Sequence, residues 1–293
     1  MAAPPAQTLV ARVAARLGLP AGQAPCVLLV APSRDAFAQL VQFRFSEADL
    51  DVVVPQPPGR AAADAATALV ILDTSLPETE PLLDRLKLDP ATNAIPAIAL
   101  FPRGHHTHRP FRLRIQADLE LIEPFQIAPF FAAADHLLAR FAQSRVPSSL
   151  RLRCIFPSSQ ADLDRAAGIA AGLFRTSSLP EADQASLLAA FREAVGNAVQ
   201  HGNRRDPVKT VRVEYYQDAR RITVVVRDEG EGFNSRPYLR QADEGDAAQA
   251  ARTRHRQGGQ GGLGILMIIR CTDQVEYNEK GNVVTFTKLL PPP

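Results

Sequence analysis

The sequence has no tryptophan, only three cysteines and almost no excess of either charge over its 293 residues. The cysteines (Cys26, Cys154 and Cys271) stand far apart and form no Cys-x-x-Cys pair, which argues against a disulfide framework. Such thiols are typical of a protein of the reducing cytoplasm, where we expect this chain to be located. The formal net charge of +2 predicts neither a nucleic-acid partner nor an acidic tail.

Long apolar runs are also missing. No stretch of about 18 or more apolar residues occurs, so we expect neither a membrane-spanning segment nor a membrane partner. Residues 2–22 carry two arginines and no acidic residue, as targeting peptides do, but they lack a continuous apolar core. Leu9, Val13 and Leu17 recur there at helical spacing, which predicts a short amphipathic helix.

The first half of the chain alternates short apolar runs with helical patterns. The apolar runs cover residues 27–30, 68–72 and 95–100. Helical patterns follow at 82–88 and 128–141. Continuous short runs of this kind indicate a parallel sheet with helices on both faces, an α/β fold. The polar segment 143–149 is predicted to be a linker.

A different pattern begins at Arg151. It contains an alternating strand, two helices, a hairpin, a glycine-rich stretch, a further helix and a last hairpin. We place these elements at residues 151–156, 160–174, 180–201, 210–216 with 221–227, 230–262, 264–271, and 274–277 with 282–289. Helices and antiparallel strands in this order predict an α/β sandwich.

Three polar side chains lie four residues apart on the helix that ends at His201. Glu193, Asn197 and His201 therefore line one helix face, opposite an apolar face. Asparagine is a poor helix former, so its place within a helix favours a function. The amide oxygen of Asn197 suits Mg²⁺, and Glu193 is able to take a proton from a nucleophile. The alternative is a solvated helix face.

Two glycine-containing segments follow. Asp228 ends a strand and precedes Gly230 and Gly232; its carboxylate is able to accept a hydrogen bond from an exocyclic amine, and the glycines allow a flat ring to approach. Any tight turn has the same pattern. Residues 258–267 are glycine-rich and run into a helix, a junction whose free N–H groups bind phosphate. The segment is neither a Walker loop nor a dinucleotide fingerprint, and a flexible linker is its alternative.

Taken in order, these segments resemble the N box and the two glycine boxes of the GHKL ATPases, and among them those of the anti-sigma-factor serine kinases. The resemblance implies a Bergerat-type α/β sandwich that binds ATP and Mg²⁺. It implies Glu193 as the general base, Asn197 as the residue that holds Mg²⁺ on the phosphates, and Asp228 as the partner of the adenine amine. The implied ATP-binding residues are Asn197, His201, Asp228, Gly230, Gly232, Gly262, Leu263 and Gly264. Residues 234–260 would form a mobile lid.

Residues 25–142 resemble a response-regulator receiver domain of flavodoxin-like fold, with Asp73 at the phosphoacceptor position. The acidic pair expected after the first strand is replaced by Ala31-Pro32, the expected hydroxyl by Phe101 and the expected lysine by Glu123. Mg²⁺ would then have a single carboxylate, and Glu123 would repel a phosphoryl group. We therefore predict a pseudo-receiver that serves as an interaction or dimerisation surface, with Asp73 a vestigial phosphoacceptor.

The expected layout is an extension (1–24), a pseudo-receiver (25–142), a linker (143–150) and a GHKL kinase domain (151–290). The resemblance implies an ATP-dependent serine/threonine kinase that phosphorylates a STAS-type anti-sigma-factor antagonist, with a sigma factor as a further partner and a homodimer as its assembly. One alternative is a nucleotide-binding scaffold without kinase activity. The other is a histidine-kinase-like ATPase, which the missing dimerisation helix pair disfavours.

Overall fold

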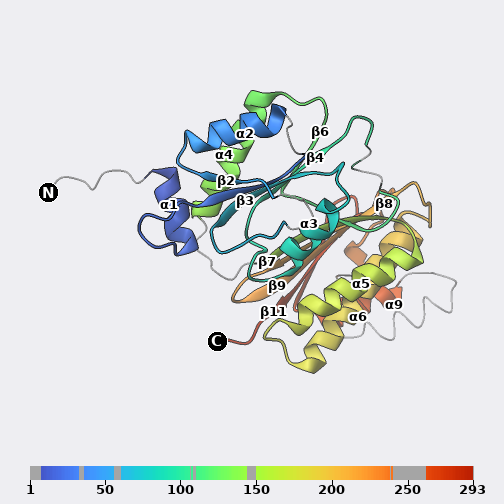
Figure 1. The fold of residues 1–293 in the computed structure, drawn as a ribbon. Helices are drawn as coiled ribbons and strands as arrows, with labels where there is room; N and C mark the ends of the chain where they lie inside the picture. The colour runs from blue at the N-terminus through green and yellow to red at the C-terminus, as the bar shows by residue number, and fades with distance from the viewer. Residues whose placement is uncertain are drawn as a thin grey trace. The chain divides into compact units, whose positions relative to one another are not determined.

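The computed structural model describes residues 8–32, 36–55, 61–105, 107, 110–143, 150–237, 239 and 262–292. The chain divides into two compact units (Figure 1). The first comprises residues 1–107 and 115–147, and the second residues 108–114 and 148–293. Among the described residues, no helix is both long and apolar enough to span a bilayer.

The first unit contains a five-stranded parallel sheet with the order β2-β1-β3-β4-β6. Its strands are β1 (Cys26–Val30), β2 (Asp51–Val53), β3 (Thr67–Asp73), β4 (Ala97–Phe101) and β6 (Leu119–Ile122). Every residue of β1 and β4 is buried, as their continuous apolar runs predicted. This is the strand order of a flavodoxin-like sheet, and the predicted α/β class is confirmed.

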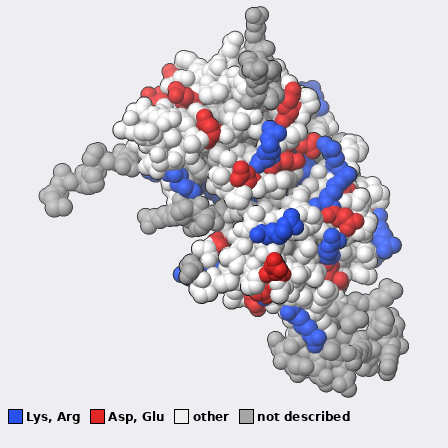
Figure 2. All heavy atoms as spheres, turned by 60° about the horizontal axis from the view of Figure 1, so that its bottom comes forward, with Lys and Arg blue, Asp and Glu red and all other residues white. Residues whose placement is uncertain are grey.

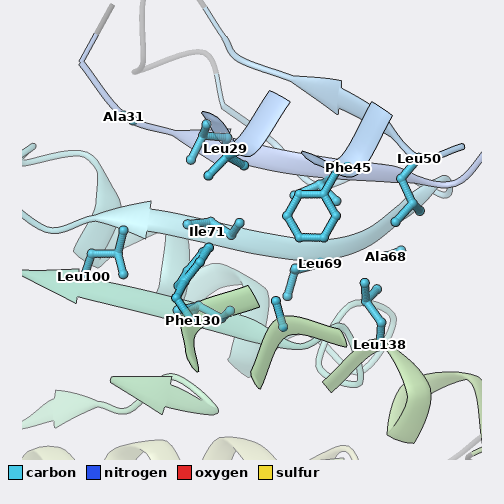
Figure 3. Packing of buried hydrophobic residues seen from close by; sticks show 14 of the residues in the cluster. Leu29, Ala31, Phe45, Leu50, Ala68, Leu69, Ile71, Leu100, Phe130 and Leu138 are labelled. Atoms are coloured by element: carbon cyan, nitrogen blue, oxygen red, sulfur yellow. The ribbon is translucent and has the colours of Figure 1, made fainter. Parts of the chain in front are cut away.

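Helices cover the two faces of this sheet unequally. Helices α1 (Leu9–Leu17), α2 (Ala36–Ser46) and α4 (Ile127–Gln143) share one apolar core with the sheet. In that core Phe45 of α2 and Phe130 of α4 lie close to Leu29 and Ile71 of the sheet (Figure 3). Only α3 (Thr79–Leu88), of the described helices, contributes to the core of the other face.

The predicted N-terminal helix is confirmed as α1. Thr8 caps its start by accepting a hydrogen bond from the N–H of Ala11 (3.2 Å), and Gly18, with φ of 68°, ends it in the left-handed conformation. Val13 is 1% exposed within the core shared with α4, so α1 is an integral part of the first unit.

The second unit is a sandwich of one sheet and one helical layer. The sheet has the order β10-β11-β9-β8-β7-β5, and the pairs from β10 to β7 are antiparallel. Helix α6 packs against both α5 and α9, so the three helices form one layer. The elements are β7 (Leu150–Pro157), α5 (Gln160–Arg175), α6 (Glu181–Asn197), η2 (Ala198–Gly202), β8 (Thr210–Gln217), β9 (Arg221–Arg227), α9 (Gly262–Cys271), β10 (Gln274–Tyr277) and β11 (Val283–Leu289).

Alternate residues of the central strands carry the core of this sandwich. In β9, for example, Ile222, Val224 and Val226 are buried, whereas the residues between them are partly exposed.

On the face of the molecule shown in Figure 2, basic and acidic side chains are interspersed, in keeping with the net charge of +2.

One short segment of the second unit comes from the middle of the first unit's sequence. Its last residue, Arg114, begins strand β5 (Arg114–Ile115), which is the edge strand beside β7. The backbone N–H of Leu113 donates to Asp162 Oδ1 (2.9 Å), and Asp162 lies in the first turn of α5. Residues 108–114 therefore belong to the second unit, although the residues on either side of them belong to the first.

Candidate nucleotide-binding site

The polar row lies on α6 and on the π-helix that continues it. Glu181 and Asp183 lie in the first turn of α6, where their charge favours helix formation. After Asn197 the helix widens into η2, and the N–H of Asn203 bonds the carbonyl of Ala198 (2.8 Å). Wide turns of this kind are frequent at functional sites. Here the wide turn carries His201.

A pocket of about 260 Å³ opens beside this helix. Its wall comes from the C-terminal part of α6, η2, the segment after β9, α9 and the β10–β11 hairpin. Four predicted ligand-binding residues line it, namely Asn197, His201, Asp228 and Gly232. Glu193, Gly230 and Gly264 lie beside the pocket and are not among the described residues that line it. Of Leu263 the structure describes no side chain, and most of the expected lid, 240–260, lies outside the described residues.

Asp228 is half-buried at the end of β9. Burial raises the pKa of its carboxyl group, while the N–H of Gly230, which bonds Oδ1 at 2.7 Å, and the positive charges of Lys280 and Lys209 lower it. The backbone of Asp228 is fixed on β11, because its N–H donates to the carbonyl of Asn282 (3.1 Å). Asn282 Nδ2 donates in turn to the carbonyl of Asp228 (3.0 Å). The carboxylate is thus held rigidly where a ligand amine is able to reach it.

Three glycines allow the chain to pack closely around Asp228. A Cβ at Gly202 would lie 2.4 Å from Asp228 Cγ, and one at Gly230 would lie 2.3 Å from the carbonyl oxygen of Gly202. Gly232 has φ of 78°, and a Cβ there would lie 1.8 Å from the carbonyl oxygen of Lys280. Sequence reasoning assigned Gly230 and Gly232 to the approach of a flat ring. In the structure these two glycines also allow neighbouring backbone segments to touch.

Asn203 was not identified from the sequence. It is 0% exposed, and its Nδ2 donates to Ser158 Oγ and to the carbonyl of Thr210, both at 2.8 Å. Its Oδ1 accepts from the N–H of Glu229 (2.8 Å). Asn203 therefore joins the end of η2 to the segment that carries Asp228. The only signal in the sequence is its place two residues after His201.

Glu193 faces the start of α9. A Cβ at Gly264 would lie 1.7 Å from Glu193 Oε1, so the carboxylate contacts the first turn of that helix. The first backbone N–H groups of a helix lack partners within the helix and carry a positive partial charge. Glu193 also acts on Tyr277: burial, followed by the negative charge of Glu193, raises the pKa of the Tyr277 phenol.

One wall of the pocket is apolar. Phe233 and Tyr277 form an edge-to-face pair with ring centroids 5.4 Å apart, and both line the pocket. Ala194, Val226 and Ile265 line it as well. An apolar wall beside one half-buried carboxylate suits a flat heterocycle with an exocyclic amine.

The site also suits a metal that a ligand brings with it. Among the described residues, no cluster of three or more His, Cys, Asp or Glu is placed to hold a cation. Mg²⁺ commonly takes one or two protein ligands and completes its shell with phosphate oxygens and water. Asn197, which lines the pocket one helical turn from Glu193, would supply the protein ligand.

Residues 156–288 match the family model of the histidine kinase-like ATPase domain. The match includes the polar row, Asp228 and the start of α9, and it stops within the last strand. The second unit is therefore similar to a histidine kinase-like ATPase domain, which supports ATP binding at this pocket. A comparison with curated proteins found no match.

Several solved structures are similar to parts of the chain. A response regulator from Chloroflexus aurantiacus J-10-fl is 20% identical, with a TM-score of 0.30, and the match covers 40% of this chain and 99% of that one. The signal receiver domain of a LuxO repressor protein from Vibrio parahaemolyticus is 21% identical, with a TM-score of 0.31 and coverage of 40% and 92%. NtrX from Brucella abortus, solved with ADP, is 16% identical, with a TM-score of 0.32 and coverage of 59% and 41%. At these TM-scores the receiver-like fold rests on the strand order of the first unit itself.

The residues at the expected phosphoacceptor site of the first unit lie at the ends of its strands. Asp73 ends β3, and its Oδ1 accepts a hydrogen bond from the N–H of Ser75 (2.9 Å). Ala31 follows β1 and is 2% exposed, and Phe101 is 4% exposed. Glu123 follows β6, and its N–H donates to the carbonyl of Phe101 (2.9 Å). Asp73 thus stands at the carboxyl ends of the parallel strands beside an alanine and a phenylalanine.

Proposed function

We propose that this protein is an ATP-dependent serine/threonine kinase of the anti-sigma-factor type, which phosphorylates a STAS-type anti-sigma-factor antagonist. The observation that carries the proposal is the position of Glu193. Its carboxylate lies one helical turn before Asn197 and against the first turn of α9. A carboxylate at that point is suited to accept the proton of a serine hydroxyl.

The two ends of the pocket bind different parts of the nucleotide. Asp228 and the apolar wall receive the nucleobase, and Asn197 holds Mg²⁺ on the phosphates near the start of α9. Phosphoryl transfer depends mainly on the positioning of the reactants and the neutralisation of charge. The free N–H groups at the start of α9 would contribute to both, because the N-terminus of a helix favours the binding of phosphate groups.

Labelling with [γ-³²P]ATP tests the proposal. Wild type and Glu193→Gln are incubated with a STAS-type antagonist, and ATP binding is measured for both. We expect Glu193→Gln to bind ATP with unchanged affinity and to transfer phosphate about 10²- to 10⁴-fold more slowly, as is typical when a general base is lost. Equal labelling by the two proteins would remove Glu193 from catalysis and, with it, the support for the proposal.

The description of the matching family model favours a second candidate, a histidine-kinase-like ATPase. Phosphoserine survives acid treatment, whereas phosphohistidine is hydrolysed. Label that disappears from the acceptor after mild acid would therefore contradict the serine kinase proposal and support the second candidate.

A nucleotide-binding scaffold is the third candidate. It is favoured by the absence of Glu193 from the described residues that line the pocket and by the contact of its carboxylate with α9. ATP binding by wild type without labelling of any acceptor would support it. Our proposal also includes a sigma factor as partner, a homodimer and a cytoplasmic location; light scattering of the purified chain checks the dimer.

A further inference from the structure

Two consecutive arginines after η2 have an unusual backbone. Arg204 and Arg205 have φ of 56° and 58°, in the left-handed region that residues with a Cβ seldom occupy. Conformations of this kind persist only where the surrounding structure enforces them. Two contacts hold this backbone: the N–H of Arg205 donates to the carbonyl of Val199 (2.8 Å), and the residue before the pair, Asn203, is buried.

The two side chains have different surroundings. Arg204 lines the nucleotide pocket, whereas Arg205 is not among the described residues that line it. Arg204 Nη2 lies 3.7 Å from Glu231 Oε2, and Glu231 also lines the pocket. The two side chains are 78% and 91% exposed, so water screens this pair and a ligand is able to replace it.

Arg204 lies at the Asp228 end of the pocket. Gly202, two residues before it, is in contact with the Asp228 carboxylate, and Glu231, its ion-pair partner, lies three residues after Asp228. Asn197 lines the pocket two helical turns earlier in the sequence. The backbone turn at residues 204–205 therefore places the guanidinium beside the base end.

We propose that the Arg204 guanidinium stacks on the solvent-facing side of the nucleobase and leaves Glu231 when the nucleotide binds. The apolar wall with Phe233 and Tyr277 supports the other side of the ring. Guanidinium is planar and weakly hydrated, so it stacks well on flat rings. This inference rests on the proposed function only in that ATP occupies this pocket with its base at Asp228.

Isothermal titration calorimetry of the full chain with ATP, ADP and adenosine tests whether Arg204 stacks on the nucleobase. We expect Arg204→Ala to weaken all three ligands by the same factor, about three- to tenfold, because all three carry the base. Arg205→Ala is the matched control: it removes the same charge and keeps a Cβ at a left-handed residue. We expect it to leave the three affinities within about twofold of wild type.

Two results would overturn the inference. If Arg204→Ala weakens ATP and ADP but not adenosine, the side chain binds phosphate. If Arg204→Ala and Arg205→Ala behave alike, the effect is one of net charge or folding; thermal melting without nucleotide identifies a folding defect. Arg204→Lys keeps the charge and loses the flat group, so we expect it to bind adenosine as weakly as Arg204→Ala does. Wild-type affinity in Arg204→Lys would contradict stacking.

The outcome for wild type separates this inference from the proposed kinase. If wild type binds ATP but transfers no phosphate, the kinase proposal fails and the titrations still decide the role of Arg204. If wild type binds neither ATP nor adenosine, the role of Arg204 and the ATP-binding assignment fail together.

Discussion

Gly264 and Glu193 meet so closely that position 264 has no room for a methyl group: a Cβ there would lie 1.7 Å from Glu193 Oε1. The sequence resemblance implied that Gly264 contacts phosphate. The structure adds that Gly264 sets the distance between the candidate base and the first turn of α9. Two residues that are far apart in the sequence thus define one point of the site.

We expect Gly264→Ala to lower phosphoryl transfer at least tenfold while the free energy of unfolding changes by only about 1–2 kcal/mol. The reason is that the clash is with the far end of a flexible side chain, which is able to swing away and leave its place at α9. Kinase assays and urea denaturation measure the two effects.

Gly196→Ala is the control, because a Cβ at Gly196, in the same helix as Glu193, meets nothing within 4 Å. We expect it to stabilise the protein by about 0.5–1 kcal/mol and to retain activity. Full activity in Gly264→Ala would show that the contact has no part in catalysis.

Asn203→Ala is expected to destabilise the protein by about 2–4 kcal/mol, because it removes three hydrogen bonds, two of which are buried. Ser158→Ala removes one of these hydrogen bonds and the bond from Ser158 Oγ to the carbonyl of Lys209 (3.0 Å), and a smaller loss of about 1–2 kcal/mol is expected. Urea denaturation compares the two variants. Equal losses would contradict the central role of Asn203.

The Asp228 carboxyl is expected to oppose folding at neutral pH. Its pKa in the folded state is raised above 3.8, chiefly by burial, so the folded state holds this proton more tightly than the unfolded state does. The group therefore stabilises the fold below pH 3.8, and this contribution is lost as the pH rises through the raised folded-state pKa.

Asp228→Asn should accordingly raise the Tm at pH 7, and the gain should shrink as the pH falls toward 3.8. The same change should weaken ATP binding about tenfold or more, because a charge-assisted hydrogen bond is lost. Thermal melting across a pH series and ATP titration test the two effects. A lower Tm at pH 7 with unchanged ATP affinity would contradict both.

Asp73 is expected to remain unphosphorylated. Ala31 stands where an acidic pair would hold Mg²⁺, and Glu123 replaces the lysine that would neutralise the phosphoryl group. Incubation with acetyl phosphate and Mg²⁺, followed by intact-mass measurement, checks this, with Asp73→Asn as the blank. A phosphoryl adduct in wild type alone would show that the receiver unit is active.

Most of the secondary structure could be predicted, because the apolar runs that form β1, β3 and β4 and the periodic patterns that form α5 and α6 are strong local signals. Helix α2 was missed, because it buries Ala38, Val41 and Phe45 yet also exposes Leu40 and Phe43, which blurs its period. The three-residue strand β2 and the two-residue strand β5 are too short to leave a pattern.

The candidate site divides in the same way. Asn197, His201 and Asp228, which line the pocket, could be predicted as site residues because their spacing within one helix, or their place at a strand end, is local in the sequence. The contact between Gly264 and Glu193 and the hydrogen bonds of Asn203 join distant segments, and no local pattern encodes such contacts. The π-helix η2 likewise could not be predicted, because backbone hydrogen bonds from residues that follow it, Asn203 and Arg205, hold its carbonyl groups.

Residues 108–114 have a consequence for dissection of the chain. Because they belong to the second unit and interrupt the first, the polypeptide passes between the units three times. A single cut near residue 147 therefore does not release an intact ATPase: a fragment that begins at residue 148 loses β5 from its sheet edge and the Leu113 hydrogen bond from Asp162. The two units are covalently interleaved, so replacement of the first unit as one continuous segment would also remove residues 108–114 of the second unit.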